Sequence, residues 1–371
     1  MLSRPTRAIV DLDAVRHNLQ AVRRRVGPGC RIAPVVKADG YGHGSIPVAR
    51  AVLDAGADML CVALAQEGVE LRQSLPDASI LVFGTVFPDE VDAVVESGLV
   101  QTVDDEAMLP HFDRAAASCG RQARLHLKVD TGMSRLGVWP EEALPFMRQA
   151  ARYRRVRVEG IYSHFANSDA RDQTFARRQL ALFREVVEDL EAHGFSFEVA
   201  HIANSAAVLS MPESHLDMVR PGIMVYGLRP ASHLGDGLRP AMAVVSRITR
   251  LKLLPARTPV GYGCTWQSDE PRRIATIPIG YADGYRRQLS NGFHVLVRGQ
   301  KAPVVGRVCM DMLMADVTDV AGAAKGDDVL IFGRIGGDWL PAEEMAAAAG
   351  TIPYEIVAGI GPRVPRVYGT P

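Results

Sequence analysis

A lysine at the end of an apolar run is the residue of this chain best suited to covalent chemistry. The run Ala33-Pro-Val-Val leads directly into Lys37, and glycines follow at positions 40, 42 and 44. A short buried strand would carry the amine at its end, and the glycines would let the backbone approach a ligand closely. An unpaired ammonium is costly in such a place, but a lysine can lose its charge, for example as an imine. The plain alternative is an exposed lysine between a strand and a loop.

Other polar side chains also stand at or just beyond the ends of apolar runs. They are Lys128, His164, His201 and Arg220, with Asn204 and Ser205 opening a helix after His201. For any one of these residues, surface polarity would be a sufficient explanation. If the runs are strands of one parallel barrel, all of these residues lie at its carboxyl-terminal mouth, where barrel enzymes have their active sites. Their shared position therefore predicts a single site.

Strands and helices that alternate along the first part of the chain would position these residues. The strand candidates are 32–36, 59–63, 80–83, 99–103, 125–129, 156–163, 197–202 and 218–219. The helix candidates run from Asp11 or Asp13 to Val26 and over 46–54, 88–96, 105–117, 140–153 and 172–193. Eight strands that alternate with helices predict a (β/α)8 barrel, although a doubly wound sheet has the same alternation.

The character of the sequence changes after residue 228. Residues 229–240 are rich in proline and glycine, as a linker would be. The runs beyond them, 243–254, 274–279, 295–297, 304–308 and 329–332, are of β type, and only 342–349 is a good helix candidate. We therefore expect an N-terminal (β/α)8 TIM-type barrel, residues 1–233, followed by a mostly-β C-terminal domain, residues 234–371. The first residues of the chain are expected to pair with the second domain.

Composition and charge narrow the function classes. The chain of 371 residues is 47% hydrophobic and 23% charged, and 42 Lys and Arg residues balance 42 Asp and Glu residues, so no net charge favours nucleic acid or a membrane surface. Five scattered cysteines without a Cys-x-x-Cys pair indicate neither a disulfide framework nor a metal site. No apolar run approaches the roughly 20 residues of a membrane span, and no signal region is recognisable. We therefore expect a cytoplasmic protein.

The segment Val35-Val-Lys-Ala-Asp-Gly-Tyr-Gly-His-Gly44 closely resembles the pyridoxal-phosphate lysine motif of the alanine racemase family. The segments 128–137, 163–169 and 220–223 resemble further motifs of the same family. In the second domain, the matching segments are 260–266, 280–284 and 305–311. The resemblance covers nearly the whole chain.

The resemblance implies an enzyme with pyridoxal 5'-phosphate as its cofactor and two catalytic bases. Lys37 would hold the cofactor covalently and act as one base, and Tyr262 of a partner subunit would act as the other. A homodimer with shared active sites follows. Two bases on opposite faces suit racemisation, because the returning proton must reach the face that it did not leave. The implied reaction interconverts L-alanine and D-alanine and supplies D-alanine for peptidoglycan.

The family also implies how the cofactor is held. The implied phosphate contacts are Tyr41, Ser205 beside Asn204, the backbone amides of Gly222 and Ile223, and Tyr354. Arg220 would donate a hydrogen bond to the pyridine nitrogen. Because arginine stays charged, it cannot give that nitrogen a proton, so the cofactor would be a weaker electron sink than with an aspartate partner.

Further roles follow from the same motifs. Arg135 would approach the phenolic oxygen of the cofactor, and in many family members the lysine that matches Lys128 is carbamylated and steadies that arginine. An ion pair of Lys128 with Asp130 is the plain alternative. His164, Arg220 and His201 would form a hydrogen-bond chain behind Tyr262. The implied substrate contacts are Arg135, the Met310 amide and Asp311, and the entrance would be narrowed by Tyr281 and Tyr354 and lined by Asp169, Arg287, Arg307 and Ile352.

One stretch departs from the family pattern. After Tyr354-Glu-Ile the family often has a cysteine, whereas this chain continues Val-Ala-Gly, so Ala358 and Gly359 are expected to change the packing near the phosphate. Asp39 and His43 have no assigned role.

Three other functions remain open on the sequence. A broad-specificity racemase for alanine and serine would share the framework, but such enzymes are typically exported. A barrel-type amino-acid decarboxylase should show a cysteine motif near the C-terminus and a different lysine loop. A non-enzymatic pyridoxal-phosphate-binding protein would lack the second domain.

Overall fold

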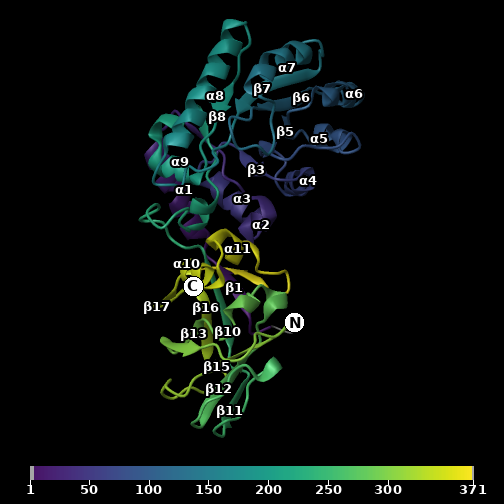
Figure 1. Ribbon diagram of the computed structural model, residues 1–371. Coiled ribbons are helices and arrows are strands. Elements are labelled where there is room, and N and C mark those ends of the chain that lie inside the picture. Colours follow the sequence, from purple (N-terminus) through teal and green to yellow (C-terminus); the bar gives the residue numbers. More distant parts are fainter. Residues whose placement is uncertain (1–3, 370–371) are drawn as a thin grey trace.

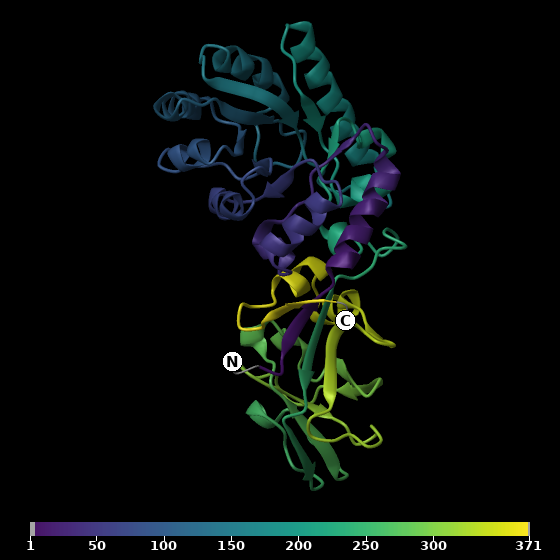
Figure 2. The same cartoon turned by 180° about the vertical axis from the view of Figure 1, so that it is seen from behind.

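The chain forms two domains stacked end to end, as Figures 1 and 2 show from opposite sides. A computed structural model describes residues 4–369. Strand β1 (Arg7–Val10) pairs antiparallel with β10 (Met242–Arg247) and parallel with β18 (Arg366–Tyr368). The start of the chain therefore lies in the sheet of the second domain, as expected, and helix α1 (Leu12–Val26) then leads into the barrel.

The first domain is a ring of eight parallel strands. Their order is β2-β9-β8-β7-β6-β5-β4-β3, with bounds β2 Arg31–Ile32, β3 Leu60–Val62, β4 Ile80–Val82, β5 Val100–Val103, β6 Ala123–Lys128, β7 Val156–Tyr162, β8 Val199–His201 and β9 Met218–Val219. A bridge between Val35 and Cys61 joins the first strand to the last, and the Cys61 amide donates to the Pro34 carbonyl at 2.9 Å. An open doubly wound sheet would keep two free edges. The predicted (β/α)8 barrel is confirmed.

The helices lie outside this ring, and all except the one at 65–74, which was not predicted, lie close to their predicted positions. They are α3 Ser45–Asp54, α4 Ala65–Ser74, α5 Val91–Glu96, α6 Leu109–Cys119, α7 Ala143–Ala150, α8 Thr174–Ala192 and α9 Ser205–Ser210. Helix α1 begins where its cap was predicted, because the Asp11 carboxylate accepts hydrogen bonds from the amides of Asp13 and Ala14. No helix within residues 4–369 has the length and apolar character needed to cross a membrane.

The second domain is mostly β, as predicted. Its larger sheet has the order β14-β13-β16-β10-β1-β18, with β17 beside β16, and its smaller sheet has the order β11-β12-β15. The bounds are β11 Arg250–Leu254, β12 Arg272–Ile277, β13 His294–Val297, β14 Gln300–Pro303, β15 Leu313–Asp316, β16 Asp328–Ile335 and β17 Asp338–Leu340. The smaller sheet occupies the end of the molecule away from the barrel (Figure 1).

The second domain differs from the prediction in three details. The predicted run 243–254 forms two strands, β10 and β11, which belong to different sheets. Residues 304–308 form no continuous strand; Val304 makes only a single bridge, to Ala315. The backbone turns at Gly306, which has a φ of +74°, and a strand cannot continue through it. Helix α10 (Ala342–Ala349) was predicted, but α11 (Pro353–Ala358), which carries Tyr354, was not, because six residues give too short a periodic pattern.

Candidate active site

The barrel mouth gathers the polar residues that were predicted to share it. Lys128 and His201 are the last residues of β6 and β8, and His164 and Arg220 lie just beyond β7 and β9. Lys37 opens the short helical turn α2 (Lys37–Tyr41), directly after the first strand. All five stand at the carboxyl ends of parallel strands, which is the end at which the barrel prediction placed the site.

The backbone after Lys37 has an unusual hand. Ala38, Asp39, Gly40 and Tyr41 all have φ between 51° and 60°, and Gly42 continues at 80°. A left-handed turn costs an L-residue roughly 1–2 kcal/mol, and such turns usually involve single residues. The sequence predicted a glycine loop here, and nothing in Ala38 or Asp39 signals this conformation. Strain of this kind persists only where surrounding contacts impose it.

Three side chains hold the left-handed turn. Glu67 of α4 accepts a hydrogen bond from the Ala38 amide at 2.6 Å, and Asp39 accepts one from the Ser45 amide at 2.8 Å. Buried His43 places Nδ1 at 3.1 Å and 3.0 Å from the carbonyl oxygens of Gly40 and Tyr41, so Nδ1 must carry a proton and donate. Asp39 and His43 thus have structural roles. Glu67 was missed: its spacing from Leu64 signals a helix cap but not its reach to the turn.

Lys37 is half-buried at the start of this turn. Burial lowers the pKa of its ammonium, and the positive charge of Arg135 lowers it further, while the Glu67 carboxylate opposes both effects. A neutral amine is the nucleophilic and basic form of lysine. The local surroundings therefore favour the form that could bond covalently to a carbonyl compound and later take up a proton.

A continuous hydrogen-bonded chain runs behind the mouth. His126 Nδ1 lies 2.9 Å from His201 Nε2, His201 Nδ1 contacts the Arg220 guanidinium, and Arg220 also lies 3.2 Å from His164 Nδ1. Because arginine only donates, it requires an unprotonated Nδ1 on His201, whose Nε2 then donates to His126. The order of donors along the chain is therefore fixed by Arg220.

Because these hydrogen-bonded residues are buried, the three histidines are neutral and Arg220 carries the positive charge among them. Burial lowers the pKa of His126 to about 3, and the pKa values of His164 and His201 fall well below their usual range, each helped by the charge of Arg220. The same desolvation lowers the pKa of Arg220 to about 10, which leaves it charged at neutral pH. Tyr162, whose ring stacks on His201 at 4.8 Å, and His126 were missed from the sequence, because an isolated histidine or tyrosine in an apolar strand resembles any core residue.

A second cluster at the mouth forms a cradle of donors. Ser205 Oγ accepts a hydrogen bond from the Gly222 amide at 2.8 Å, and a Cβ on Gly222 would come within 2.7 Å of the Tyr41 hydroxyl. The rings of Tyr41 and Tyr354 lie 6.1 Å apart. Asn204 caps α9, and Ile223 is fully buried beside Gly222. The structure therefore brings the predicted phosphate contacts together, and a side chain at Gly222 would collide with the Tyr41 hydroxyl.

Lys128 is a buried amine without a partner. Its side chain is 5% exposed, its Nζ has no hydrogen-bond partner among residues 4–369, and it lies 4.8 Å from the centre of the Tyr162 ring. Burial, with the nearby charge of Arg220, lowers the pKa of Lys128 to about 7. Asp130 accepts hydrogen bonds from the amides of residues 132–134 and makes none with Lys128. Arg135 is exposed at the mouth, and its charge also lowers the Lys128 pKa.

The predicted residues of the second domain lie elsewhere. Tyr262, in the connection between β11 and β12, is 71% exposed, and Met310 is 52% exposed. Asp311 pairs with Arg363 at 2.7 Å, and the Tyr281 amide donates to the Cys309 carbonyl at 3.0 Å. The sheet next to Tyr262 is at the far end of the molecule from Lys37 (Figure 1). The remaining residues predicted for the approach, Asp169, Arg287, Arg307 and Ile352, are exposed.

Known proteins match both domains. The family model described as alanine racemase, N-terminal domain, matches residues 10–230, and the one described as alanine racemase, C-terminal domain, matches residues 241–368. The chain is 44% identical to the alanine racemase of Desulfovibrio desulfuricans over 98% of both sequences. It is 45% identical to that of Symbiobacterium thermophilum over 99% of this chain and 97% of the relative. The crystal structure of alanine racemase from D-cycloserine-producing Streptomyces lavendulae has a TM-score of 0.94 at 37% identity and covers 100% of this chain and 98% of its own.

Proposed function

The chain belongs to the alanine racemase family, and from this membership we propose that it interconverts L-alanine and D-alanine with pyridoxal 5'-phosphate. Its relatives are racemases, which places the chain among the isomerases. The observation that carries the proposal is the half-buried Lys37, with its lowered pKa, at a barrel mouth that also holds a cradle of donors. D-Alanine for peptidoglycan, made in the cytoplasm, is the proposed product.

The residues at the mouth fit this cofactor. The Gly222 backbone lies against the Tyr41 hydroxyl and donates to Ser205, so these polar groups suit a phosphate, and Ile223 and Tyr354 complete the proposed phosphate contacts. Lys37 offers a neutral amine for covalent attachment of the aldehyde. When bound, the cofactor supplies an electron-withdrawing ring that stabilises the charge left on the α-carbon of an amino acid after its proton is removed.

Arg220 limits how strongly such a ring is polarised. Its guanidinium donates to the carbonyl oxygens of Ser163 and Ile202 at 2.8 Å and 3.1 Å as well as to two histidines. With its pKa at about 10, it stays charged at neutral pH, so it can hydrogen-bond to a ring nitrogen without giving up a proton. We propose that His201 and His164 keep Arg220 in place for this contact.

Two groups are proposed to move the α-proton. The Lys37 amine takes or returns the proton on one face, and the Tyr262 phenol oxygen of a second copy does so on the other. Tyr262 of the same chain lies beside the far sheet, which supports a homodimer with shared sites. Arg135 and the Met310 amide are the proposed contacts of the substrate carboxylate.

Lys128 has the environment of a carbamylated lysine. Its buried amine, with a pKa of about 7, is largely neutral under mildly alkaline conditions and can attack the carbon of CO2. The new N–C bond forms as one C–O π bond opens, and the nitrogen releases one proton to solvent. The product is an anion near the charges of Arg220 and Arg135, which we propose that it steadies.

Reduction and peptide mapping test the proposed function. The purified chain, saturated with pyridoxal 5'-phosphate, should convert L-alanine to D-alanine. Reduction with borohydride before digestion should leave the pyridoxyl label on Lys37, with the Lys37→Arg variant as the control that loses it. A label on any other lysine, or cofactor binding without D-alanine formation, would contradict the proposal. Serine offered in parallel measures how strictly alanine is preferred.

A further inference from the structure

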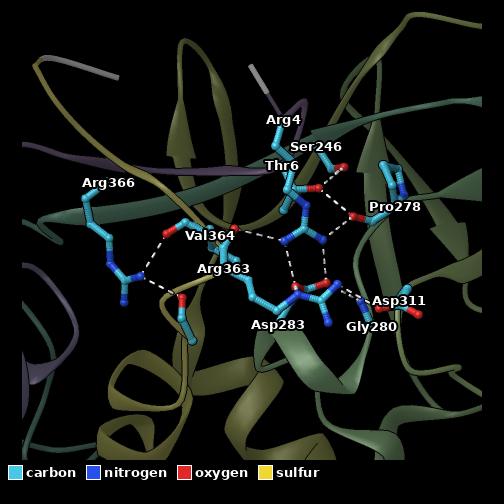
Figure 3. Close-up of polar contacts among 11 residues, drawn as sticks. Arg4, Thr6, Ser246, Pro278, Gly280, Asp283, Asp311, Arg363, Val364 and Arg366 are labelled. Carbon is cyan, nitrogen blue, oxygen red and sulfur yellow. Dashed lines mark hydrogen bonds and ion pairs between the residues drawn. The ribbon is translucent and has the colours of Figure 1, made fainter. Parts of the chain in front are cut away.

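We propose that residues 360–368, the C-terminal strap, fix both halves of the active site: Arg366 positions the turn that carries Lys37, and Arg363 positions the loop that carries Met310. Both would be positioning residues for the reaction. The inference rests on the proposed function only for its activity measurements. Its structural part concerns contacts within one chain, which Figure 3 shows together.

Arg366 joins the strap to the lysine turn. Its Nε donates to the Gly42 carbonyl at 2.9 Å, and its two Nη atoms donate to the carbonyl oxygens of Ile360, Gly361 and Val364. All four partners are backbone carbonyls. A guanidinium has five donors in a rigid fork, so it holds these two stretches of backbone at a fixed distance. This arrangement identifies Arg366 as a link between the strap and the turn.

The turn also packs directly against the second domain. A Cβ at Gly42 would meet the Val357 carbonyl oxygen at 2.3 Å, and a Cβ at Gly44 would meet the Tyr368 hydroxyl at 2.0 Å. The chain therefore needs glycine at both positions for close approach as well as for positive φ. Tyr368 belongs to the strap and Val357 to α11, so the lysine turn takes its position from the C-terminal part of the chain.

Arg363 joins the same strap to the Met310 loop. Its Nη2 donates to Asp311 at 2.7 Å, and its Nε lies 3.5 Å from Asp283. Asp283 is fully buried and accepts two hydrogen bonds of 2.6 Å from Arg4 and one of 3.0 Å from the Gly280 amide. Figure 3 shows Asp283 between the two arginines. Burial opposes ionisation of Asp283, but these hydrogen bonds and charges outweigh it and lower its pKa.

The Asp283 segment and the Met310 segment form one unit. The amides of Tyr281 and Ala282 donate to the carbonyl oxygens of Cys309 and Met310, both at 3.0 Å. A Cβ on Gly280 would lie 2.3 Å from the Cys309 oxygen, so the two segments are in direct contact. A shift of Asp283 is therefore transmitted to the Met310 amide.

The strap is itself anchored in the sheet. Its strand β18 pairs with β1, and the Gly361 amide donates to the Asp283 carbonyl at 3.1 Å. One short segment thus connects Lys37 with Met310. In the proposed dimer, the Lys37 turn serves one active site and the Met310 loop serves the other. The strap would then make a separate contact with each of the two sites.

Hydrogen exchange on the holoenzyme tests the two links separately. Arg366→Met should speed exchange of the Gly40, Gly42 and Gly44 amides roughly tenfold, because charge-assisted hydrogen bonds are lost, and should leave the Tyr281 and Ala282 amides unchanged. Arg363→Met should speed exchange of the Tyr281 and Ala282 amides about threefold, since its ion pair is half-exposed, and should leave the Gly40, Gly42 and Gly44 amides unchanged. The exposed side chain of Arg178 on α8 makes no hydrogen bond or ion pair within residues 4–369, so Arg178→Met is the control.

Activity measurements should divide in the same way. Arg366→Met should weaken cofactor retention, seen in the absorbance after dialysis, and lower kcat, whereas Arg363→Met should raise KM for alanine and retain the cofactor. Arg363→Lys should bring KM part of the way back to the wild-type value. Arg366→Lys should not rescue cofactor retention, because an ammonium has only three donors. Equal effects of both variants on both measurements, or effects no larger than those of Arg178→Met, would overturn the proposal. If the wild-type chain fails to racemise alanine, the exchange pattern still decides it.

Discussion

The barrel mouth and the part of the second domain that carries Tyr262 differ in how their predicted site residues are held. At the mouth, Arg220 is fully buried with hydrogen bonds to two histidines and two carbonyls, so it is held rigidly. In the second domain, Tyr262 and Met310 are exposed on connections between strands. Both regions use left-handed backbone; side chains such as Glu67 and His43 hold the Lys37 turn, and Asn291 accepts a hydrogen bond from the Gly306 amide in the second domain.

This difference indicates which half of the active site is preformed within one chain and which half is not. Buried polar groups that are fully hydrogen-bonded specify one arrangement without outside help. Exposed aromatic and methionine side chains are typical of surfaces that are covered by another protein. We therefore interpret the mouth as a preformed half-site and the face around Tyr262 as the half that is completed only against a second copy.

The largest effect is expected from removing the amine at the preformed half. Lys37→Ala should lower kcat for alanine racemisation by at least roughly 10²–10⁴-fold, the usual contribution of a positioned base, and should also remove covalent cofactor attachment. The assay is D-alanine formation at saturating cofactor. Lys325→Ala, at an exposed lysine of the second domain, is the matched control and should retain full activity. Comparable activity in the two variants would remove Lys37 from the mechanism.

Mixing two inactive variants tests whether the two bases of one active site come from different chains. Tyr262→Phe and Lys37→Ala should each be nearly inactive alone. After dissociation and reassociation at equal concentrations, about a quarter of the wild-type activity should return, because half of the dimers are mixed and each holds one complete site. If both bases came from one chain, mixing would restore nothing. Each variant dissociated and reassociated alone is the control.

The cradle at the mouth should respond to a single methyl group. Gly222→Ala places a Cβ 2.7 Å from the hydroxyl of buried Tyr41, and overpacking of this size costs about 1–3 kcal/mol, so the dissociation constant of the cofactor should rise by a factor of about 5 to 150. Titration of the apoprotein, followed by absorbance, measures it. Gly29→Ala, where no atom lies within 4 Å of the new Cβ, is the control. Unchanged cofactor affinity in Gly222→Ala would place the phosphate elsewhere.

The residues that meet at the barrel mouth can largely be predicted from the sequence. Apolar runs mark parallel strands, and strands that share a barrel end at one mouth, so Lys37, Lys128 and Arg220 could be grouped without coordinates. The left-handed turn could not be predicted, because Ala38 and Asp39 adopt it under contacts from distant residues. His126 was missed because a histidine inside an apolar strand has no distinctive pattern.

Long-range ion pairs are equally invisible in the sequence. Arg4 and Asp283 are separated by 279 positions, and nothing in either neighbourhood indicates the other. Arg363 and Asp311 are 52 positions apart. The resemblance to known motifs named Tyr262, but only the fold shows that the connection between β11 and β12, which carries it, lies far from the Lys37 turn of the same chain.

The smallest expected effect concerns stability in acid. It distinguishes the buried histidines behind the barrel mouth from the exposed Tyr262 of the second domain, and the measurement needs no cofactor. His126 titrates near pH 6.5 when unfolded and at about 3 when folded, so between these values the unfolded chain binds more protons, and stability must fall as the pH drops. His126→Gln, whose amide oxygen can still accept from His201, should remove up to about 1.4 kcal/mol of this loss per pH unit. Urea midpoints at pH 7 and 4.5 measure it. Tyr262→Phe should keep the full wild-type loss, because its ring lies outside the buried chain. An identical acid loss in His126→Gln and the wild type would mean that the chain of neutral histidines does not set the stability of the mouth.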